Sequence, residues 1–189
     1  MRRRGRTAIG RGALREEQVQ TFVHDNVRAG LLAPQELYDE VARAVREELP
    51  WRQESETARS WISAAQSAWA SDAESWPAVT DYSRLQSAFT KLEVGGVAVL
   101  QACEDHWAAA AVLRSRPDVR GVAWFLPSDV WHAISAGMLE VNLWHGSGAN
   151  VAPGDELLVW VESVLVGCGL PAHFDEGRIE VSARWQRHP

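Results

Sequence analysis

Four residues that can bind a metal ion or take part in catalysis stand together at Cys103-Glu104-Asp105-His106. Thiolate, carboxylate and imidazole groups all bind zinc, but a closed zinc site normally combines two pairs of closely spaced ligands. No second pair of this kind follows in the sequence. We therefore expect no metal and no cofactor, and interpret the four residues as the end of a strand followed by an acidic helix cap.

The same region also offers the components of a nucleophilic site. Cys103 can act as a nucleophile, His132 or His145 as a base, and Asp129 as the carboxylate that orients the base. These residues belong to separate elements, so only the fold can bring them together. Cys103, His106, Asp129 and His145 are the candidate catalytic residues, although a packed or surface position is the commoner role for each histidine.

Two other stretches invite a chemical interpretation. His145-Gly146-Ser147-Gly148 is rich in glycine, but it lacks the Gly-Lys-Ser/Thr ending of a phosphate-binding loop, so we interpret it as a flexible connection. Cys168 lies between two glycines with no histidine or arginine close to it in the sequence. These surroundings favour a buried, inert thiol.

The elements that would position these residues begin with helices. Apolar residues recur at helical spacing from Val19 to Val27, and Gly30 follows at the position of a C-terminal cap. Pro34 begins a second helical pattern that Pro50 ends, and a third runs from about residue 54 to residue 73. The first two patterns predict a helical hairpin. Asp81 is suited to cap a fourth, bridging helix that ends at Gly95-Gly96.

The pattern after Gly96 changes to that of a sheet. Apolar or alternating runs predict strands at residues 97–103, 121–126 and 138–144, separated by helices near residues 107–113 and after Ser128. A helix over residues 155–166 precedes a terminal hairpin around Asp175-Glu176-Gly177. The predicted fold class is α+β: an N-terminal helical hairpin and bridging helices, then a mixed sheet of about five strands with helices packed on it.

The charge is distributed unevenly along the chain. Residues 1–12 carry five arginines and no acid, whereas residues 13–189 carry 14 basic and 25 acidic groups. We divide the chain into a disordered basic tail over residues 1–13, a helical segment over 14–78 and an α/β sheet domain over 79–189. Because an acidic body repels nucleic acid, we do not expect nucleic acid as a partner.

Composition places the chain among ordinary globular proteins. It has 189 residues, of which 46% are hydrophobic and 23% charged. No apolar run approaches the roughly 18 residues of a membrane span, and the basic start has no apolar segment behind it, so we expect neither a membrane protein nor a secreted one. Two cysteines provide no disulfide framework, which favours a reducing compartment. The predicted location is the cytoplasm.

Two motifs resemble those of an uncharacterised bacterial domain family. The first is Trp76-Pro77-Ala78-Val79-Thr80-Asp81, continuing through Arg84-Leu85 and Ala88-Phe89 to Leu92; the second is Arg178-Ile179-Glu180-Val181, followed by Arg184-Trp185. The resemblance spans roughly residues 15–188 and implies no activity. Many members of the family carry several cysteines after the first strand, where this chain has Cys103 alone.

These observations lead to two functional hypotheses. The first is a non-catalytic cytosolic interaction or regulatory module, because no catalytic motif is complete and an acidic body suits another protein or a basic ligand. The alternative is a small hydrolase-like enzyme with a pocket where the loops after the first three strands meet, near Cys103, His106, Asp129 and His145. That pocket requires the three strands to be parallel.

Overall fold

The computed structural model describes residues 5–189, with side chains described from Gly12 onwards. The chain divides into a helical unit, which ends at Trp76 and also includes His188–Pro189, and a sheet unit over Pro77–Arg187. Three helices form the helical unit: α1 (Gly5–Ala29), α2 (Pro34–Glu48) and α3 (Glu54–Ala73). The structure thus confirms the predicted order of N-terminal helices followed by a sheet.

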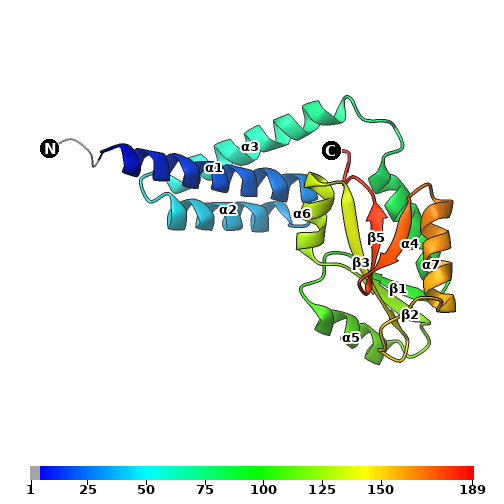
Figure 1. Ribbon diagram of the computed structural model, residues 1–189. Coiled ribbons are helices and arrows are strands. Elements are labelled where there is room, and N and C mark those ends of the chain that lie inside the picture. The colour runs from blue at the N-terminus through cyan, green and yellow to red at the C-terminus, as the bar shows by residue number, and fades with distance from the viewer. Residues whose placement is uncertain (1–4) are drawn as a thin grey trace. The chain divides into compact units, whose positions relative to one another are not determined.

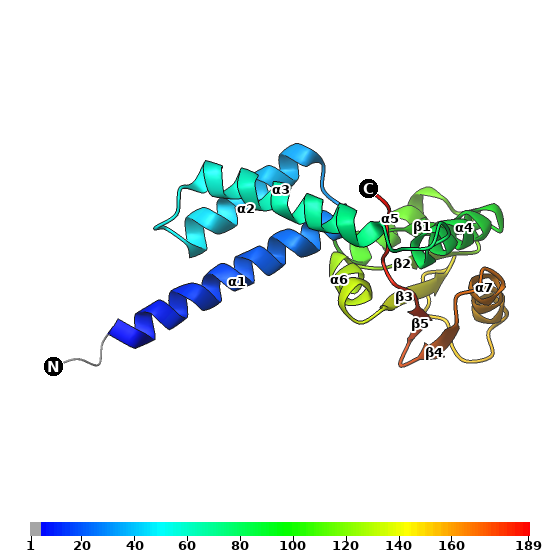
Figure 2. The ribbon, with the colours of Figure 1, turned by 90° about the horizontal axis from the view of Figure 1, so that it is seen from above.

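The three helices pack side by side around one apolar core (Figures 1 and 2). The core consists of the residues that recur at helical spacing, among them Val23, Val41, Val45 and Ala58, each at most 1% exposed. Pro34 is the first residue of α2, and the Glu36 carboxylate accepts the Ala33 N–H at 2.9 Å. The third helix joins the hairpin in one bundle because α3 contacts both α1 and α2.

The first helix is longer than expected from the sequence. Residues 5–13, predicted from the sequence to belong to a disordered tail, already belong to α1, and residues 1–4 lie outside the described residues. Arginine and alanine, frequent in this stretch, are good helix formers, and each residue added to an existing helix gains a hydrogen bond without a new nucleation cost. A stable helix can therefore extend into a segment that lacks apolar periodicity.

The sheet unit contains five strands in the order β1-β2-β3-β5-β4. They are β1 (Val97–Leu100), β2 (Gly121–Trp124), β3 (Met138–His145), β4 (Ala172–Asp175) and β5 (Arg178–Ser182). Only β1 and β2 pair in parallel, and the pairs β2–β3, β3–β5 and β4–β5 are antiparallel. The mixed sheet of about five strands is thereby confirmed.

Four helices accompany the sheet: α4 (Asp81–Val94), α5 (His106–Ser115), α6 (Pro127–Ser135) and α7 (Glu156–Gly167). Figure 2 shows α4 and α7 on one side of the sheet and α5 and α6 on the other. The side facing α4 and α7 holds the main core, where Leu85, Phe89, Leu139 and Ile179 are almost completely buried. A smaller apolar cluster lies beneath α5 and includes Val122 and Trp124.

Local chemistry sets several boundaries differently from the sequence prediction. The cap of α4 is Thr80 and not Asp81, because the Thr80 hydroxyl accepts the Ser83 N–H and the Ser83 hydroxyl accepts the Thr80 N–H. The helix expected after Ser128 begins at Pro127. The first strand stops at Leu100, since Ala102 has a φ of 52°, a left-handed conformation that no strand tolerates.

The terminal hairpin forms where the sequence predicts it. Glu176 and Gly177 connect β4 to β5 with φ values of 45° and 91°. Two consecutive positive φ angles define the tight turn that suits the twist of paired strands, and glycine adopts this conformation at little cost. The turn fixes the register in which His173 pairs with Glu180 and Asp175 with Arg178.

Candidate functional site

The four candidate catalytic residues do not form one pocket. Cys103 follows β1 and Asp129 follows β2, and because these strands are parallel the two residues lie at the same edge of the sheet. His145 ends β3, where it pairs with Gly121, the first residue of β2, so it lies at the opposite edge. The antiparallel direction of β3 separates His145 from Cys103 and Asp129, so the arrangement required by the hydrolase hypothesis is absent from the described fold.

The Cys103 thiol is poorly prepared for nucleophilic attack. Its S–H donates to the backbone carbonyls of Asp105 and Phe125, at 3.5 and 3.7 Å. Burial raises the pKa of this thiol, and the negative charges of Asp105 and Asp129 raise it further. A raised pKa reduces the fraction of reactive thiolate, so these surroundings suit an inert thiol.

The Asp105 and Asp129 carboxylates accept hydrogen bonds from backbone N–H groups at the starts of α5 and α6. The Asp105 carboxylate accepts the backbone N–H groups of Trp107 and Ala108, which is the capping role expected from the sequence. The Asp129 carboxylate accepts the Leu126 N–H at 2.7 Å, at the start of α6. Burial nevertheless raises the pKa of Asp129, and the charge of Glu140 contributes in the same direction.

His145 closes the connection between β3 and α7. Its Nε2 lies 2.9 Å from Oδ2 of Asp155, and the same carboxylate oxygen accepts the Ala152 N–H at 2.7 Å. These two hydrogen bonds, the one from Ala152 first, lower the pKa of Asp155. The connection around Gly146–Gly154 is therefore held by side chains at its base.

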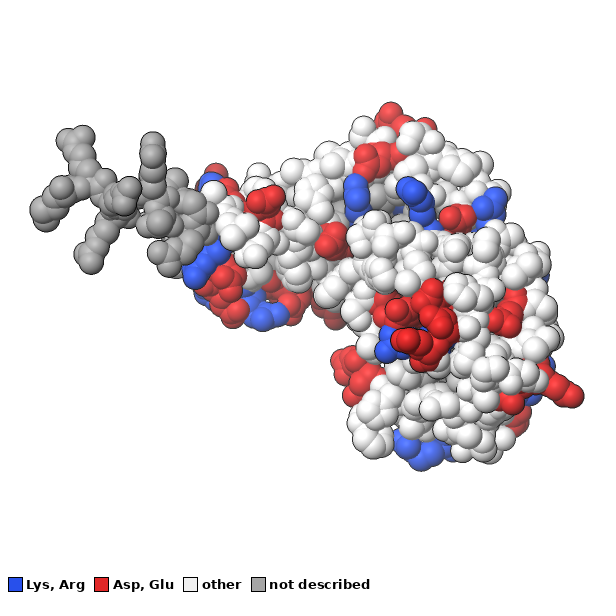
Figure 3. All heavy atoms as spheres, viewed as in Figure 1, with Lys and Arg blue, Asp and Glu red and all other residues white. Residues whose placement is uncertain are grey.

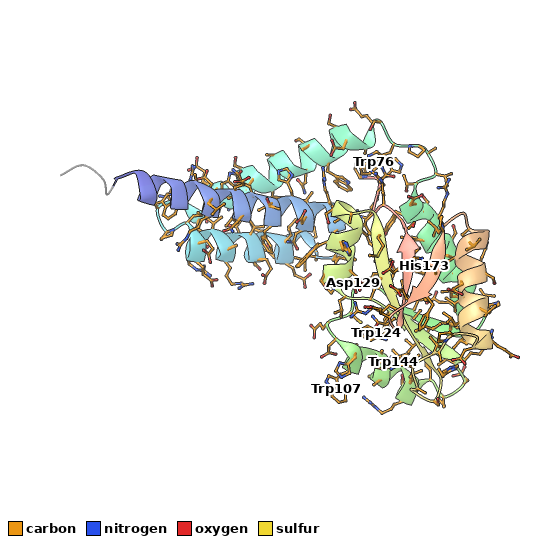
Figure 4. All side chains as sticks on the ribbon, in the orientation of Figure 1. Trp76, Trp107, Trp124, Asp129, Trp144 and His173 are labelled. Atoms are coloured by element: carbon orange, nitrogen blue, oxygen red, sulfur yellow. The ribbon has the colours of Figure 1, made fainter. Side chains whose placement is uncertain are left out.

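An aromatic row extends from α5 to β2. It consists of Trp107, His106, Trp144 and Trp124, with successive ring centroids 4.6, 6.4 and 5.4 Å apart. Trp107 at one end is 64% exposed, whereas Trp124 at the other end is buried and its indole Nε1 has no acceptor among the described residues. Figure 4 shows Trp107, Trp124 and Trp144 near one another and below Asp129 in that view.

The sheet face that carries this row continues as an acidic surface. Residues directly opposite on paired strands share a face, and Glu140, Glu180 and His173 form such a line across β3, β5 and β4. Arg178 and Asp175 form the next pair along β5 and β4. Their neighbours Val141, Ile179 and Val181 are buried on the other face. We call Glu140, Asp175, Arg178, Glu180 and His173 the acidic sheet face.

The charges on the acidic sheet face are only partly compensated. Arg178 forms an ion pair with Glu140, and Nε2 of His173 lies 3.5 Å from Oε2 of Glu180. Like charges directly opposite on neighbouring strands destabilise a sheet, yet Glu140 and Glu180 occupy that relation. Figure 3 shows acidic side chains gathered over the β4–β5 hairpin. In the sequence, this surface was indicated only by the polar residues that alternate with apolar ones along each strand. That alternation does not reveal the order of the strands in the sheet.

Among the described residues, no group of three or more His, Cys, Asp or Glu side chains could hold a metal ion. Over the same part of the chain, no helix has the length and apolar character needed to cross a membrane. The absence of a metal and of a cofactor remains an expectation from the sequence.

The residues of the two sequence motifs contact each other within the sheet unit. Asp81 from the first motif forms an ion pair with Arg84 at 2.8 Å and accepts the backbone N–H of Arg184 from the second motif at 3.2 Å. The Tyr82 and Trp185 rings meet edge to face with centroids 4.9 Å apart. These motifs therefore join the two ends of the sheet unit and position a core, which is a structural role.

The fold and these contacts define an α+β protein whose distinctive sequence motifs stabilise its architecture. The chain belongs to the family described as Domain of unknown function (DUF6891), whose model matches residues 13–189. This match confirms the resemblance to an uncharacterised domain family. A search of curated proteins and a search of solved structures each found no match.

Proposed function

We propose that the chain is a non-catalytic interaction module of the cytoplasm that binds a basic segment of another protein on its acidic sheet face. The observation that carries the proposal is the cross-strand pair of Glu140 and Glu180. Two carboxylates side by side repel each other, and a sequence retains such a local cost most readily where function requires it. Arg178 already pairs with Glu140, so a guanidinium or ammonium group from a partner would act mainly on Glu180, beside His173, and add charge-assisted hydrogen bonds there.

The aromatic row supports the same kind of partner. Glu140, Asn142 and Trp144 alternate along β3 and therefore point to the same side of the sheet. A cationic side chain can lie over an indole ring, with an interaction energy of about 0.5–1 kcal/mol at an exposed site. An extended basic segment along β3 would reach the carboxylates with one residue and the rings with another.

The overall charge also favours a basic partner. Residues 13–189 carry 14 basic and 25 acidic groups, so the field around the body attracts positively charged molecules and repels nucleic acid. Both cysteines are free, which suits a reducing compartment.

The proposal is tested by the binding of a short arginine-rich peptide, followed by fluorescence anisotropy. The control peptide has glutamine in place of each arginine. We expect binding of the arginine peptide alone, with an affinity that falls as salt is added because ions screen exposed charges. Glu140→Gln and Glu180→Gln should each weaken binding by about 2- to 5-fold, the effect of losing one exposed charge pair.

Glu93→Gln is the matched control variant. Glu93 is exposed on α4, which packs on the other side of the sheet, and the substitution removes the same charge. If Glu93→Gln weakens binding as much as the two sheet variants do, the attraction is a general effect of net charge and the proposed surface is refuted. Equal affinity for both peptides would refute the proposal of a basic partner.

A further inference from the structure

The side chains of Lys91 and Cys168 meet between two helices of the sheet unit. Lys91 Nζ donates a hydrogen bond to Cys168 Sγ at 3.3 Å, across 77 positions of sequence. Lys91 lies in the last turn of α4 and is exposed, and Cys168 follows the last residue of α7 and is half-buried. The burial expected for Cys168 is therefore incomplete, and its cationic neighbour comes from a distant part of the chain.

The identity of the cation distinguishes this contact. Lys91 is the only lysine in the chain, beside 18 arginines. An amine can give up its proton and act as a nucleophile, whereas a guanidinium stays protonated in proteins. Cys103, the other cysteine, donates its S–H to backbone carbonyls instead. Within the described residues, Cys168 is thus the one thiol placed against a potentially nucleophilic nitrogen.

Small reagents have space to approach this sulfur. A Cβ atom added to the preceding residue, Gly167, would meet no atom within 4 Å. On the other side, a Cβ added to Gly169 would lie 3.7 Å from Nε of Arg84. Cys168 itself is half-buried and Lys91 is exposed, so part of the pair faces solvent, where a molecule the size of hydrogen peroxide can approach it.

We propose that Lys91 and Cys168 form an oxidisable pair in which hydrogen peroxide produces a covalent bond between Nζ and Sγ. In the first step Sγ attacks the peroxide, the O–O bond breaks, and Cys168 becomes a sulfenic acid with release of one water molecule. In the second step the neutral amine of Lys91 attacks Sγ. The S–O bond breaks, the hydroxide leaves with the proton lost from nitrogen as a second water molecule, and a sulfenamide remains.

The geometry favours the second step over further oxidation of the sulfur. The two atoms are already within hydrogen-bond distance, and holding two reactants together in one molecule accelerates their reaction strongly. The link is reversible, because two small thiols reduce it: one attacks Sγ and releases the amine, and the second completes a disulfide and releases Cys168. The product ties α4 to α7 on the side of the sheet that holds the main core.

The test treats the purified full chain with hydrogen peroxide and measures its mass before and after reduction. We expect a product lighter by two hydrogen atoms, a loss of tryptic cleavage after Lys91, and a cross-linked peptide containing Lys91 and Cys168. Dithiothreitol should restore the mass and the cleavage. Cys103→Ser should leave the link intact, and Lys91→Arg should abolish it and shift Cys168 to the sulfinic acid.

Three results would overturn the proposal. The first is consumption of the Cys168 thiol by peroxide in the unaltered chain without a cross-linked peptide. The second is the same mass loss in the Lys91→Arg variant, which would assign the link to another nitrogen. The third is sulfinic acid formation at equal rates in the unaltered chain and in Lys91→Arg, which would show that the amine does not intercept the sulfenic acid.

Discussion

Replacing Phe89 by alanine should destabilise the sheet unit severely. Phe89 lies on the inner side of α4, is 3% exposed, and packs against Phe125 with ring centroids 5.8 Å apart. The substitution removes the aromatic ring and leaves a cavity, which costs about 3–5 kcal/mol out of a typical total stability of roughly 5–15 kcal/mol. For a unit of this size the melting temperature should fall by about 10–20 °C.

Arg84→Ala on the same helix is the control. The Arg84 side chain is 41% exposed and its ion pair with Asp81 spans three positions of the helix, so its loss should cost less than about 1 kcal/mol. Urea unfolding followed by tryptophan fluorescence measures both variants. If Phe89→Ala proves too unstable to purify, Phe89→Leu should unfold cooperatively with a loss of about 1–2 kcal/mol. A tolerated Phe89→Ala together with a damaging Arg84→Ala would refute the assignment of the inner face of α4.

Three other predictions concern the cap of α4, the pH dependence of stability and the zinc content of the purified protein. Thr80→Ala removes the hydroxyl that caps α4 and should cost about 1 kcal/mol more in urea unfolding than Thr80→Ser, which keeps the hydroxyl and loses only a buried methyl group. The pKa of Asp129 is raised in the folded state, so the folded protein binds more protons than the unfolded chain. Asp129 therefore lowers the free energy of unfolding as the pH rises from the ordinary aspartate pKa through the raised one. Asp129→Asn, whose amide oxygen can still accept the Leu126 N–H, should remove that decline, and an unchanged pH profile of unfolding would contradict the raised pKa. Protein purified without chelators should contain no stoichiometric zinc by elemental analysis, and about one zinc per chain would overturn this.

Sequence periodicity was sufficient to predict most elements because their apolar spacing is regular. The core residues Val41, Val45 and Phe89 lie on the predicted faces of their helices. Exact ends were harder to predict where neighbouring residues compete for one role, as Thr80 and Asp81 do for the cap of α4. Both residue types are good caps, and only the backbone geometry decides between them.

Strand direction and distant contacts could not be predicted from local patterns. The short helix α6 between β2 and β3 is compatible with parallel or antiparallel pairing, so the location of His145 at the opposite edge was not accessible from the sequence. The contact between Lys91 and Cys168 depends on the packing of α4 against α7. The acidic sheet face likewise requires that β5 pair with both β3 and β4.

The position of β5 has a consequence for protein synthesis. The strand closest to the C-terminus lies inside the sheet, between β3 and β4, and not at its edge. Until β5 has left the ribosome, β3 lacks one neighbour and β4 has none, so the sheet unit cannot reach its final pairing before β5 emerges. The helical unit draws its three helices from residues 5–73 and can fold earlier, during translation. Nascent chains of this protein should therefore expose unpaired strands for a short time after the helices have formed, which is the stage at which chaperones would act on them.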